Sequence, residues 1–198
     1  MSSAENDVRP AVPEEVPALA RVLARGFVDD PIMRWTVPAE DHLERVRVFF
    51  EVFDLRTAAE GWLWTVDDGA GAALWVPPGT EAEFDEMTFS LEDVVREMLG
   101  DLNERYDEFW GWAEGMRPAE PHWYLDHIAV DPARQGSGLG GALVAHGLAL
   151  AEAAGMPAFL NTARVGNVRF YERRGFEVIE SSDAPGGGPH IWFMVHPA

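Results

Sequence analysis

Hydrophobic and polar positions predict a series of helices in the first half of the chain. From Pro13 to Phe27, apolar residues recur at the i, i+3, i+4, i+7 spacing of an amphipathic helix. A second helix is expected from Glu40 to Ala59, and Asp30-Pro31 breaks the pattern between the two. The acidic residues 81–116 predict two further helices, which are separated near Gly100.

Short apolar runs between turn residues predict the strands of a sheet. A hairpin turn is expected at Asp67-Asp68-Gly69, a proline-flanked linker at residues 117–121 and a flexible connection at residues 181–188. Helices over residues 139–154 and 167–174 each end at a glycine. The predicted strands cover residues 8–12, 61–66, 72–76, 122–130, 158–160, 176–180 and 190–195.

Composition and charge narrow the classes of function. The chain has 198 residues, 47% of them hydrophobic, which suits a single domain over residues 1–198. Its formal net charge of −19 argues against nucleic acid and against an anionic membrane surface as partners. A negative cleft would attract cationic amines, although solubility alone also explains such a charge.

Several chemistries are disfavoured by what the sequence lacks. Without cysteine there is no disulfide, thiolate metal site or cysteine nucleophile. The six histidines show no metal-ligand spacing, so no metal is expected, and there is no G-x-S-x-G nucleophile elbow. The first ten residues lack the apolar core of a secretory signal, and no apolar run could span a bilayer, which predicts a cytoplasmic protein.

Residues 130–140 form a glycine-rich loop directly before a predicted helix. Glycines let backbone N–H groups converge on one point, and the helix N-terminus adds partial positive charge, so the loop predicts a pyrophosphate site. Gly136, Gly138 and Gly141 also match the G-x-G-x-x-G dinucleotide fingerprint. We reject that interpretation, because several residues separate the strand from Gly136 and the next strand ends in Leu160-Asn161, without an acidic ribose ligand.

A second motif, N-x-x-F-Y-x-x-x-G-F, covers residues 167–176, downstream of a Q-x-x-G-x-G motif at Gln135–Gly140. With both motifs in order and at the right spacing, residues 123–180 resemble the cofactor half of the GNAT acetyltransferases. The resemblance implies an α+β GNAT fold, with a mixed, mostly antiparallel, twisted sheet of about six or seven strands flanked by helices. It also implies that residues 122–180 form the acetyl-CoA-binding half and that residues 80–116 are a helical insertion on the substrate side.

Further segments extend the resemblance over nearly the whole chain, towards the puromycin N-acetyltransferases. The resemblance implies transfer of an acetyl group from acetyl-CoA to a primary amine of a small, cationic molecule, and an aminonucleoside-like antibiotic would make this a resistance enzyme. Acetylation of a protein or peptide amine and a non-catalytic CoA-binding module are the alternatives. The similar segments are residues 42–46, 67–78, 117–125, 155–162 and 188–194, whereas residues 80–116 are much less similar.

The GNAT resemblance assigns roles to individual residues. Tyr171 matches the tyrosine that protonates the departing CoA sulfur, a task that suits a phenol with its proton still bound at neutral pH. Asp126 matches a carboxylate that accepts the proton of the amine, with His127 or water as the rival base. The implied cofactor set is the main chain of Ile128, Ala129 and Val130, the loop residues Gln135, Gly136, Ser137, Gly138, Leu139 and Gly140, and Asn161, Asn167 and Arg173.

The substrate pocket is expected where the acidic helices meet the strand 122–130. Trp123, Tyr124 and Trp110 would give it aromatic walls, next to Trp112, unless these rings only pack helices onto the sheet. The mouth would be negative if Glu81, Glu83, Asp85, Glu86, Glu92 and Asp93 face it rather than solvent. Strand periodicity places Tyr124, Asp126, Ile128 and Val130 on one face, with Leu125, His127 and Ala129 on the other. The acceptor amine, the identity of the acyl group and the formation of a homodimer stay open.

Overall fold

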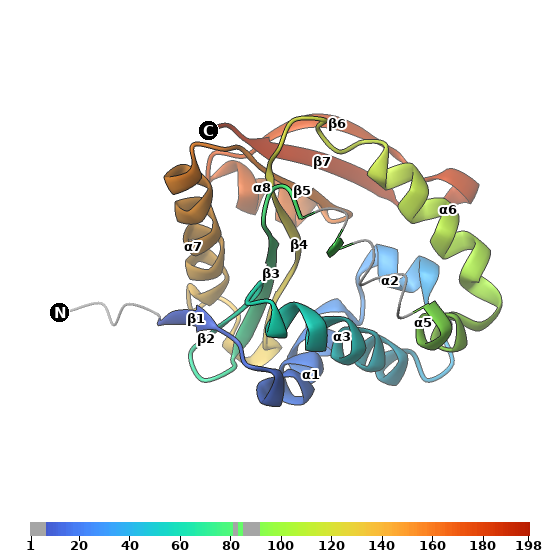
Figure 1. Cartoon of the computed structure of the whole chain (residues 1–198). Helices are drawn as coiled ribbons and strands as arrows, with labels where there is room; N and C mark the ends of the chain where they lie inside the picture. Colours follow the sequence, from blue (N-terminus) through green and yellow to red (C-terminus); the bar gives the residue numbers. More distant parts are fainter. Residues whose placement is uncertain (1–6, 81–82, 85–91) are drawn as a thin grey trace.

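The computed structural model describes residues 7–80, 83–84 and 92–198, and a twisted sheet runs through its centre (Figure 1). The seven strands are ordered β1-β2-β3-β4-β5-β7-β6, and all neighbours are antiparallel except β4 and β5. This confirms the predicted mixed, mostly antiparallel architecture. The strands are β1 (Val8–Pro10), β2 (Leu63–Val66), β3 (Gly71–Val76), β4 (Trp123–Val130), β5 (Ala158–Thr162), β6 (Glu177–Asp183) and β7 (His190–His196).

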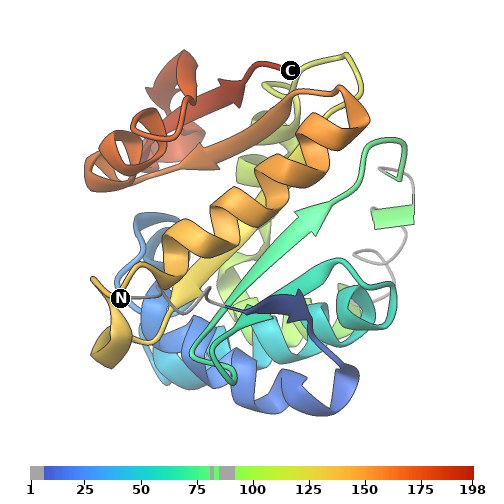
Figure 2. The ribbon, with the colours of Figure 1, turned by 90° about the vertical axis from the view of Figure 1, so that its left-hand side faces the viewer.

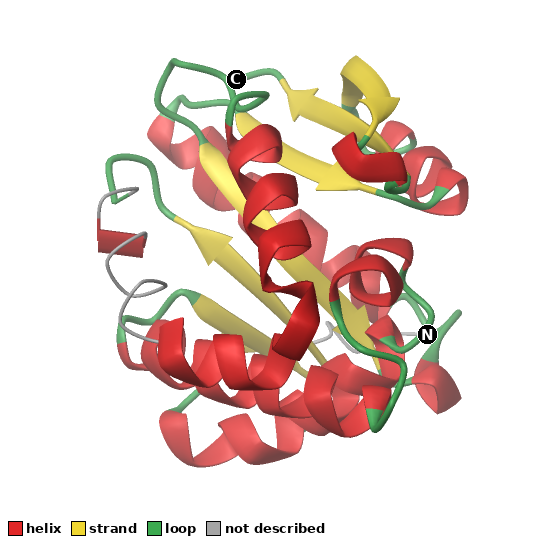
Figure 3. Ribbon diagram, turned by 90° about the vertical axis from the view of Figure 1, so that its right-hand side faces the viewer, coloured by secondary structure: helices red, strands yellow, loops and turns green. Residues whose placement is uncertain are grey.

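Helices cover both faces of the sheet. Helix α7 (Leu139–Ala154) crosses one face diagonally (Figure 2) and shares an apolar cluster with α8 (Val165–Glu172). Helices α1 (Val16–Phe27) and α3 (His42–Ala59) bury their apolar residues in a second cluster. On that side, α6 runs in front of the sheet (Figure 3), close to α2 and α5. These three helices are α2 (Pro31–Thr36), α5 (Glu92–Leu99) and α6 (Asn103–Glu114).

The predicted helical insertion is confirmed in its described part. A short 3-10 turn at Gly100–Leu102 separates α5 from α6, and Gly100 has a φ of 56°, a conformation that favours glycine. Residues 81–82 and 85–91 of the insertion lie outside the described residues. No helix among the described residues is both long and apolar enough to cross a membrane.

Two segments differ from the sequence-based expectation. Asp30-Pro31 begins a helix instead of only ending one, because the Asp30 carboxylate accepts hydrogen bonds from the N–H groups of Ile32 and Met33. Pro31 then occupies the first turn, where a missing N–H costs nothing. The connection predicted to be flexible is partly ordered, since β6 continues to Asp183 and residues 185–187 form a 3-10 turn.

Strand β4 positions the site, and its pairing is irregular on both edges. It pairs with β5 only from Trp123 to Leu125, so the remainder of that edge is unpaired within the described chain. On the other edge, Leu74 of β3 lies opposite His127, while the next residue, Trp75, lies opposite Leu125. Asp126 is therefore the extra residue of a β-bulge.

The bulge makes the predicted alternation along β4 wrong. Beyond it, the side chains are shifted by one residue, so His127 and Ala129 lie on the same face as Tyr124, towards α1 and α3. Ile128 and Val130 pack instead in the cluster on the α7 face. The extra residue puts Asp126 and His127 next to each other, and both side chains line the same cavity.

Helix α7 lies directly against the indole of Trp75 at Gly147, where an added Cβ would come within 1.9 Å of the ring. We expect Gly147→Ala to lower the free energy of unfolding by about 1–3 kcal/mol, because overpacking forces the helix or the indole to move. Urea denaturation measures the change. Gly166→Ala is the matched control, since its Cβ would meet no atom within 4 Å. Equal midpoints for the two variants would contradict this close contact.

Candidate active site

A groove of about 520 Å³ lies beside the unpaired part of β4. Its walls come from β4, the glycine loop, the start of α7 and helix α8. Of the predicted cofactor residues Gln135–Gly140, Ser137 is the one that does not line it, and its hydroxyl donates to the carbonyl oxygen of Arg134 instead. The predicted cofactor residues that line the groove are Ile128, Ala129, Val130, Gln135, Gly136, Gly138, Leu139, Gly140 and Asn167.

The glycine loop presents backbone donors to this groove. Within the described chain, no backbone N–H from Gln135 to Gly141 donates a hydrogen bond. Gly136 and Gly138 have φ angles of 79° and 92°, in the left-handed region, and Gly138 is the N-cap of α7. Unpaired N–H groups at a helix N-terminus bind anions, so the loop fits the pyrophosphate of CoA.

Arginines border the groove, but Arg173 is not among them. Arg173 follows the last residue of α8 and is exposed. Its neighbour Arg174 lines the groove, with its Cζ 3.6 Å from the centre of the Phe170 ring and its Nη1 2.7 Å from the Phe170 carbonyl oxygen. This stacking holds Arg174 on the groove side, where Arg134 and Arg164 also lie. Arg174 therefore replaces Arg173 as the phosphate-side candidate.

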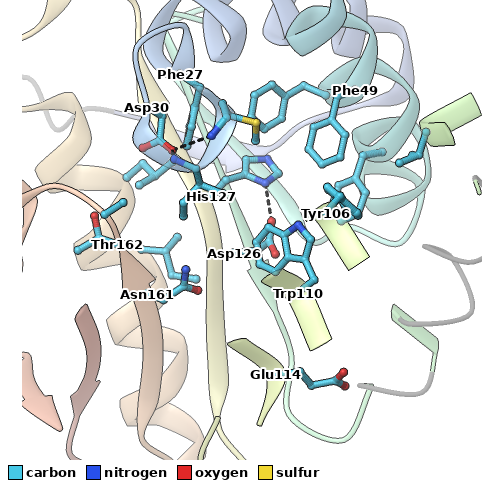
Figure 4. A pocket seen from close by; sticks show the side chains of 18 of the residues that line it. Phe27, Asp30, Phe49, Tyr106, Trp110, Glu114, Asp126, His127, Asn161 and Thr162 are labelled. Carbon is cyan, nitrogen blue, oxygen red and sulfur yellow. Dashed lines mark hydrogen bonds and ion pairs between the residues drawn. The ribbon is translucent and has the colours of Figure 1, made fainter. Parts of the chain in front are cut away.

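A second cavity, of about 500 Å³, lies next to the groove, between α3, α6 and β4 (Figure 4). It is the acceptor pocket. Its aromatic wall is formed by Phe27, Phe49, Phe50, Phe53, Phe84, Tyr106 and Trp110. The carboxylates of Asp30, Asp107, Glu114 and Asp126 also line it, together with Arg96 and Arg117. The pocket is lined by aromatic rings and carboxylates, but most of its rings come from α1 and α3 rather than from the predicted residues.

The sequence identified the aromatic wall only in part. Trp110 lines the pocket. Trp123 does not, because its position on β4 turns its indole into the cluster on the α7 face. Tyr124 is buried behind the wall, where its hydroxyl donates to Asn161 Oδ1 at 3.2 Å, and Asn161 itself lines the pocket. Trp112 packs against Phe193 of β7.

The acids predicted for the mouth are mostly not those of the pocket. Glu83 is exposed and does not line it. Glu81, Asp85 and Glu86 lie outside the described residues, as do the side chains of Glu92 and Asp93. The described negative charge comes instead from α6, from β4 and from Asp30.

The groove and the acceptor pocket meet at Tyr171. Phe27, Asp30, Ile128 and Asn167 line both cavities together with it. Tyr171 is 5% exposed, and burial raises the pKa of its hydroxyl. The phenol therefore keeps its proton at neutral pH, at the place where a thiolate leaving group would need one.

Asp126 and His127 both face the acceptor pocket (Figure 4), with Asp126 Oδ1 2.8 Å from His127 Nδ1. Burial alone would lower the pKa of His127, but the Asp54 and Asp126 carboxylates outweigh it and raise that pKa to about 10. A protonated imidazole cannot accept a proton, which leaves Asp126 as the candidate base among the two predicted residues. Among the described residues, no group of histidine and acidic side chains could hold a metal ion.

The sheet that opens between β4 and β5, the anion-binding loop and the acidic pocket are the features of an acyl-CoA-dependent N-acetyltransferase. Residues 72–176 match the model of the acetyltransferase (GNAT) family, and the chain belongs to that family. GNAT acetyltransferases use acetyl-CoA as the acetyl donor. An uncharacterised N-acetyltransferase of Schizosaccharomyces pombe is 24% identical over 169 residues, which cover 79% of this chain and 68% of that protein.

Solved structures share the fold over nearly the whole chain. A Corynebacterium glutamicum protein described as a histone acetyltransferase and related acetyltransferase has a TM-score of 0.73 and 24% identity, covering 98% of this chain and 96% of its own. The polyamine N-acetyltransferase of Drosophila melanogaster, which forms N-acetylagmatine, has a TM-score of 0.67 and 16% identity, with coverages of 97% and 99%. These similarities confirm the predicted GNAT fold.

Proposed function

We propose that the protein transfers the acetyl group of acetyl-CoA to the primary amine of a small cationic molecule that carries a flat ring. The supporting observation is the aromatic and acidic acceptor pocket, which meets the CoA-sized groove at Tyr171. Rings stack on aromatic side chains, and ammonium groups favour both carboxylates and aromatic faces. A volume of about 500 Å³ suits a small molecule.

Several groups of this chain are suited to hold the donor. The N–H groups of Gln135–Gly140 and the guanidinium of Arg174 would bind the pyrophosphate. The main chain of residues 128–130, on the unpaired edge of β4, would pair with the pantetheine arm as a neighbouring strand does. Asn167 lines both cavities, so it would contact the arm where the donor and the acceptor meet.

The reaction follows from the groups at the meeting point. Acetyl-CoA supplies a thioester carbonyl carbon. Asp126 accepts a proton from the bound ammonium, which leaves a neutral nitrogen able to attack that carbon. As the new C–N bond forms, the C–S bond breaks and Tyr171 donates its proton to the departing sulfur. The nitrogen then loses its second proton to the Tyr171 phenolate, which gives the amide and restores the hydroxyl. The enzyme forms no covalent bond with the acetyl group, so the chemistry needs only positioning, one base and one acid.

The first amines to test as acceptors are suggested by other N-acetyltransferases that this protein resembles. The resemblance to the puromycin N-acetyltransferases, which we inferred from the sequence alone, makes an aminonucleoside such as puromycin the first candidate, and its inactivation would confer antibiotic resistance. The Drosophila relative forms N-acetylagmatine, which makes agmatine the matched aliphatic cation. Thiol release from acetyl-CoA with these amines, a neutral aromatic amine and a lysine peptide is the direct test. Faster turnover of the peptide would favour a protein acetyltransferase, and no release with any amine would favour a CoA-binding module.

Salt and the indole of Trp110 test the character of the pocket. We expect kcat/KM for the aromatic cation to fall as salt rises from about 0.05 to about 0.5 M, because salt screens the pocket acids. Trp110→Ala should raise KM by roughly 2–10-fold for aromatic amines and less for agmatine. Trp123→Ala is the control, since its indole packs on the α7 face. Equal effects of the two variants, without salt dependence, would contradict an aromatic, anionic pocket.

A further inference from the structure

A buried carboxylate lies behind His127, outside the groups used so far. Asp54 of α3 is 0% exposed, and its Oδ1 lies 3.2 Å from His127 Nε2. The other ring nitrogen, Nδ1, lies 2.8 Å from Asp126 Oδ1. Asp54, His127 and Asp126 thus form a continuous chain from the interior of the helical layer to the wall of the acceptor pocket.

These contacts determine how many protons the three side chains of Asp54, His127 and Asp126 hold together. His127 Nδ1 lies within hydrogen-bond distance of Asp126 Oδ1, and since a carboxylate only accepts, we assign a proton to Nδ1. Neither His127 Nε2 nor Asp54 Oδ2 has a hydrogen-bond partner among the described residues. Because Nε2 lies 3.2 Å from Asp54 Oδ1, an unprotonated Nε2 would turn its lone pair towards a buried carboxylate oxygen, which is unfavourable. With a second proton on Nε2, the three residues hold two hydrogens and a net charge of −1.

The surroundings keep this proton in place near neutral pH. Burial raises the pKa of the Asp54 carboxyl, and the two carboxylates raise the pKa of His127 against the opposing effect of burial. The hydroxyls of Tyr106 on α6 and Tyr124 on β4 stay neutral, since burial and Asp126 raise their pKa. From α1 and α3, phenylalanine rings face the imidazole.

We propose that Asp54, His127 and Asp126 act as one proton-accepting chain in which Asp54 is a positioning residue. The proposal rests on the proposed function, because it needs an ammonium group in the acceptor pocket. Asp126 takes a proton from the ammonium on its other oxygen, Oδ2, and the proton on His127 Nε2 moves to Asp54. The net charge of the chain then changes from −1 to 0, and the nitrogen of the acceptor becomes neutral.

The buried carboxylate matters because of the charge beside Asp126. In the protonated chain, the positive charge of His127 lies 2.8 Å from the carboxylate of Asp126. Transfer of the Nε2 proton to Asp54 removes that positive charge when Asp126 needs to bind a proton. Without Asp54, the imidazole can lose its positive charge only by releasing a proton from the site.

The protonation of His127 can be measured by ¹⁵N NMR of the histidine rings, with the signals assigned by their loss in His127→Gln. In the wild-type protein we expect both ring nitrogens to carry protons at about pH 8, where ordinary histidines are neutral. In Asp54→Asn the pKa of His127 should fall by about one to three pH units. The exposed Asp101→Asn removes the same charge and should leave His127 unchanged. A neutral His127 in the wild type would overturn the proposal without any variant or substrate.

The pH dependence of kcat/KM tests the role in catalysis. In Asp54→Asn, the three side chains have a net charge of −1 only at pH values at which His127 is neutral. The titration of the amine cancels in the ratio of variant to wild-type kcat/KM. This ratio should therefore fall by about 10²-fold as the pH drops through the lowered pKa of His127. A ratio that is the same at all pH values would reduce Asp54 to a structural residue and overturn the proposal. If no amine reacts, the proposed function fails, while the NMR result still decides the protonation of the chain.

Discussion

Tyr171→Phe is expected to lower kcat by about 10²-fold or more, the scale of general acid catalysis, with little change in the affinity for CoA. The substitution keeps the ring that packs between the groove and the acceptor pocket and removes only the hydroxyl. Without that proton, the departing sulfur must leave as a thiolate in a buried site, which is costly. Because burial raises the pKa of Tyr171, the wild type should not lose activity through ionisation of this phenol near neutral pH.

Steady-state kinetics with saturating acetyl-CoA, together with CoA binding by calorimetry, separate these effects. Tyr106→Phe is the matched comparison, since it removes the same hydroxyl from the wall of the acceptor pocket. We expect it to change KM for the amine more than kcat. Wild-type kcat in Tyr171→Phe would show that the thiolate leaves unaided and that the tyrosine has no catalytic role.

Helix α7 and its loop could be predicted from the sequence because their signals are local. The helix covers residues 139–154 as predicted, between Gly138 and Gly155, which have φ angles of 92° and 61°. Each glycine acts on the turn of chain next to it, and no distant residue is needed. The same holds for the free N–H groups of the loop, and most of the residues predicted to bind the cofactor line one groove.

Strand β4 could not be predicted in the same way. Its bulge at Asp126 depends on the register with β3, which is a long-range property. Periodicity alone therefore assigned Ile128 and Val130 to the wrong face. It also placed His127 and Asp126 on different faces of the strand. Trp123 was assigned to the pocket from its neighbours in sequence, although the strand turns it towards α7.

The sequence alone places Asp54 on a buried helix face, but it does not show which residue pairs with it. The residue follows Val46, Phe50 and Phe53 on the apolar side of the predicted helix, where a carboxylate is costly unless it is paired. Such a position indicates a buried charge that needs a partner. The partner is His127, and only the packing of α3 against β4 brings the two together.

Gly138→Asp is expected to abolish CoA binding. Residue 138 is the N-cap of α7 with a φ of 92°, so a side chain there is strained by about 1–2 kcal/mol. An aspartate at this position would also accept hydrogen bonds from the first N–H groups of the helix and repel the pyrophosphate with its charge. At a concentration of about 100 times Kd, CoA should stabilise the wild type by about 2.7 kcal/mol, and the variant should show no such gain.

Thermal unfolding with and without CoA measures this difference, and the control must separate phosphate binding from backbone strain. Gly61→Asp provides it, because Gly61 has a φ of 77°, has no atom within 4 Å of an added Cβ and lies outside the groove. We expect Gly61→Asp to lower the Tm and to keep the full CoA-induced rise, whereas Gly138→Asp loses that rise. A normal rise in Gly138→Asp would mean that the phosphates bind elsewhere, since no pyrophosphate could share the N-terminus of α7 with a carboxylate at its N-cap.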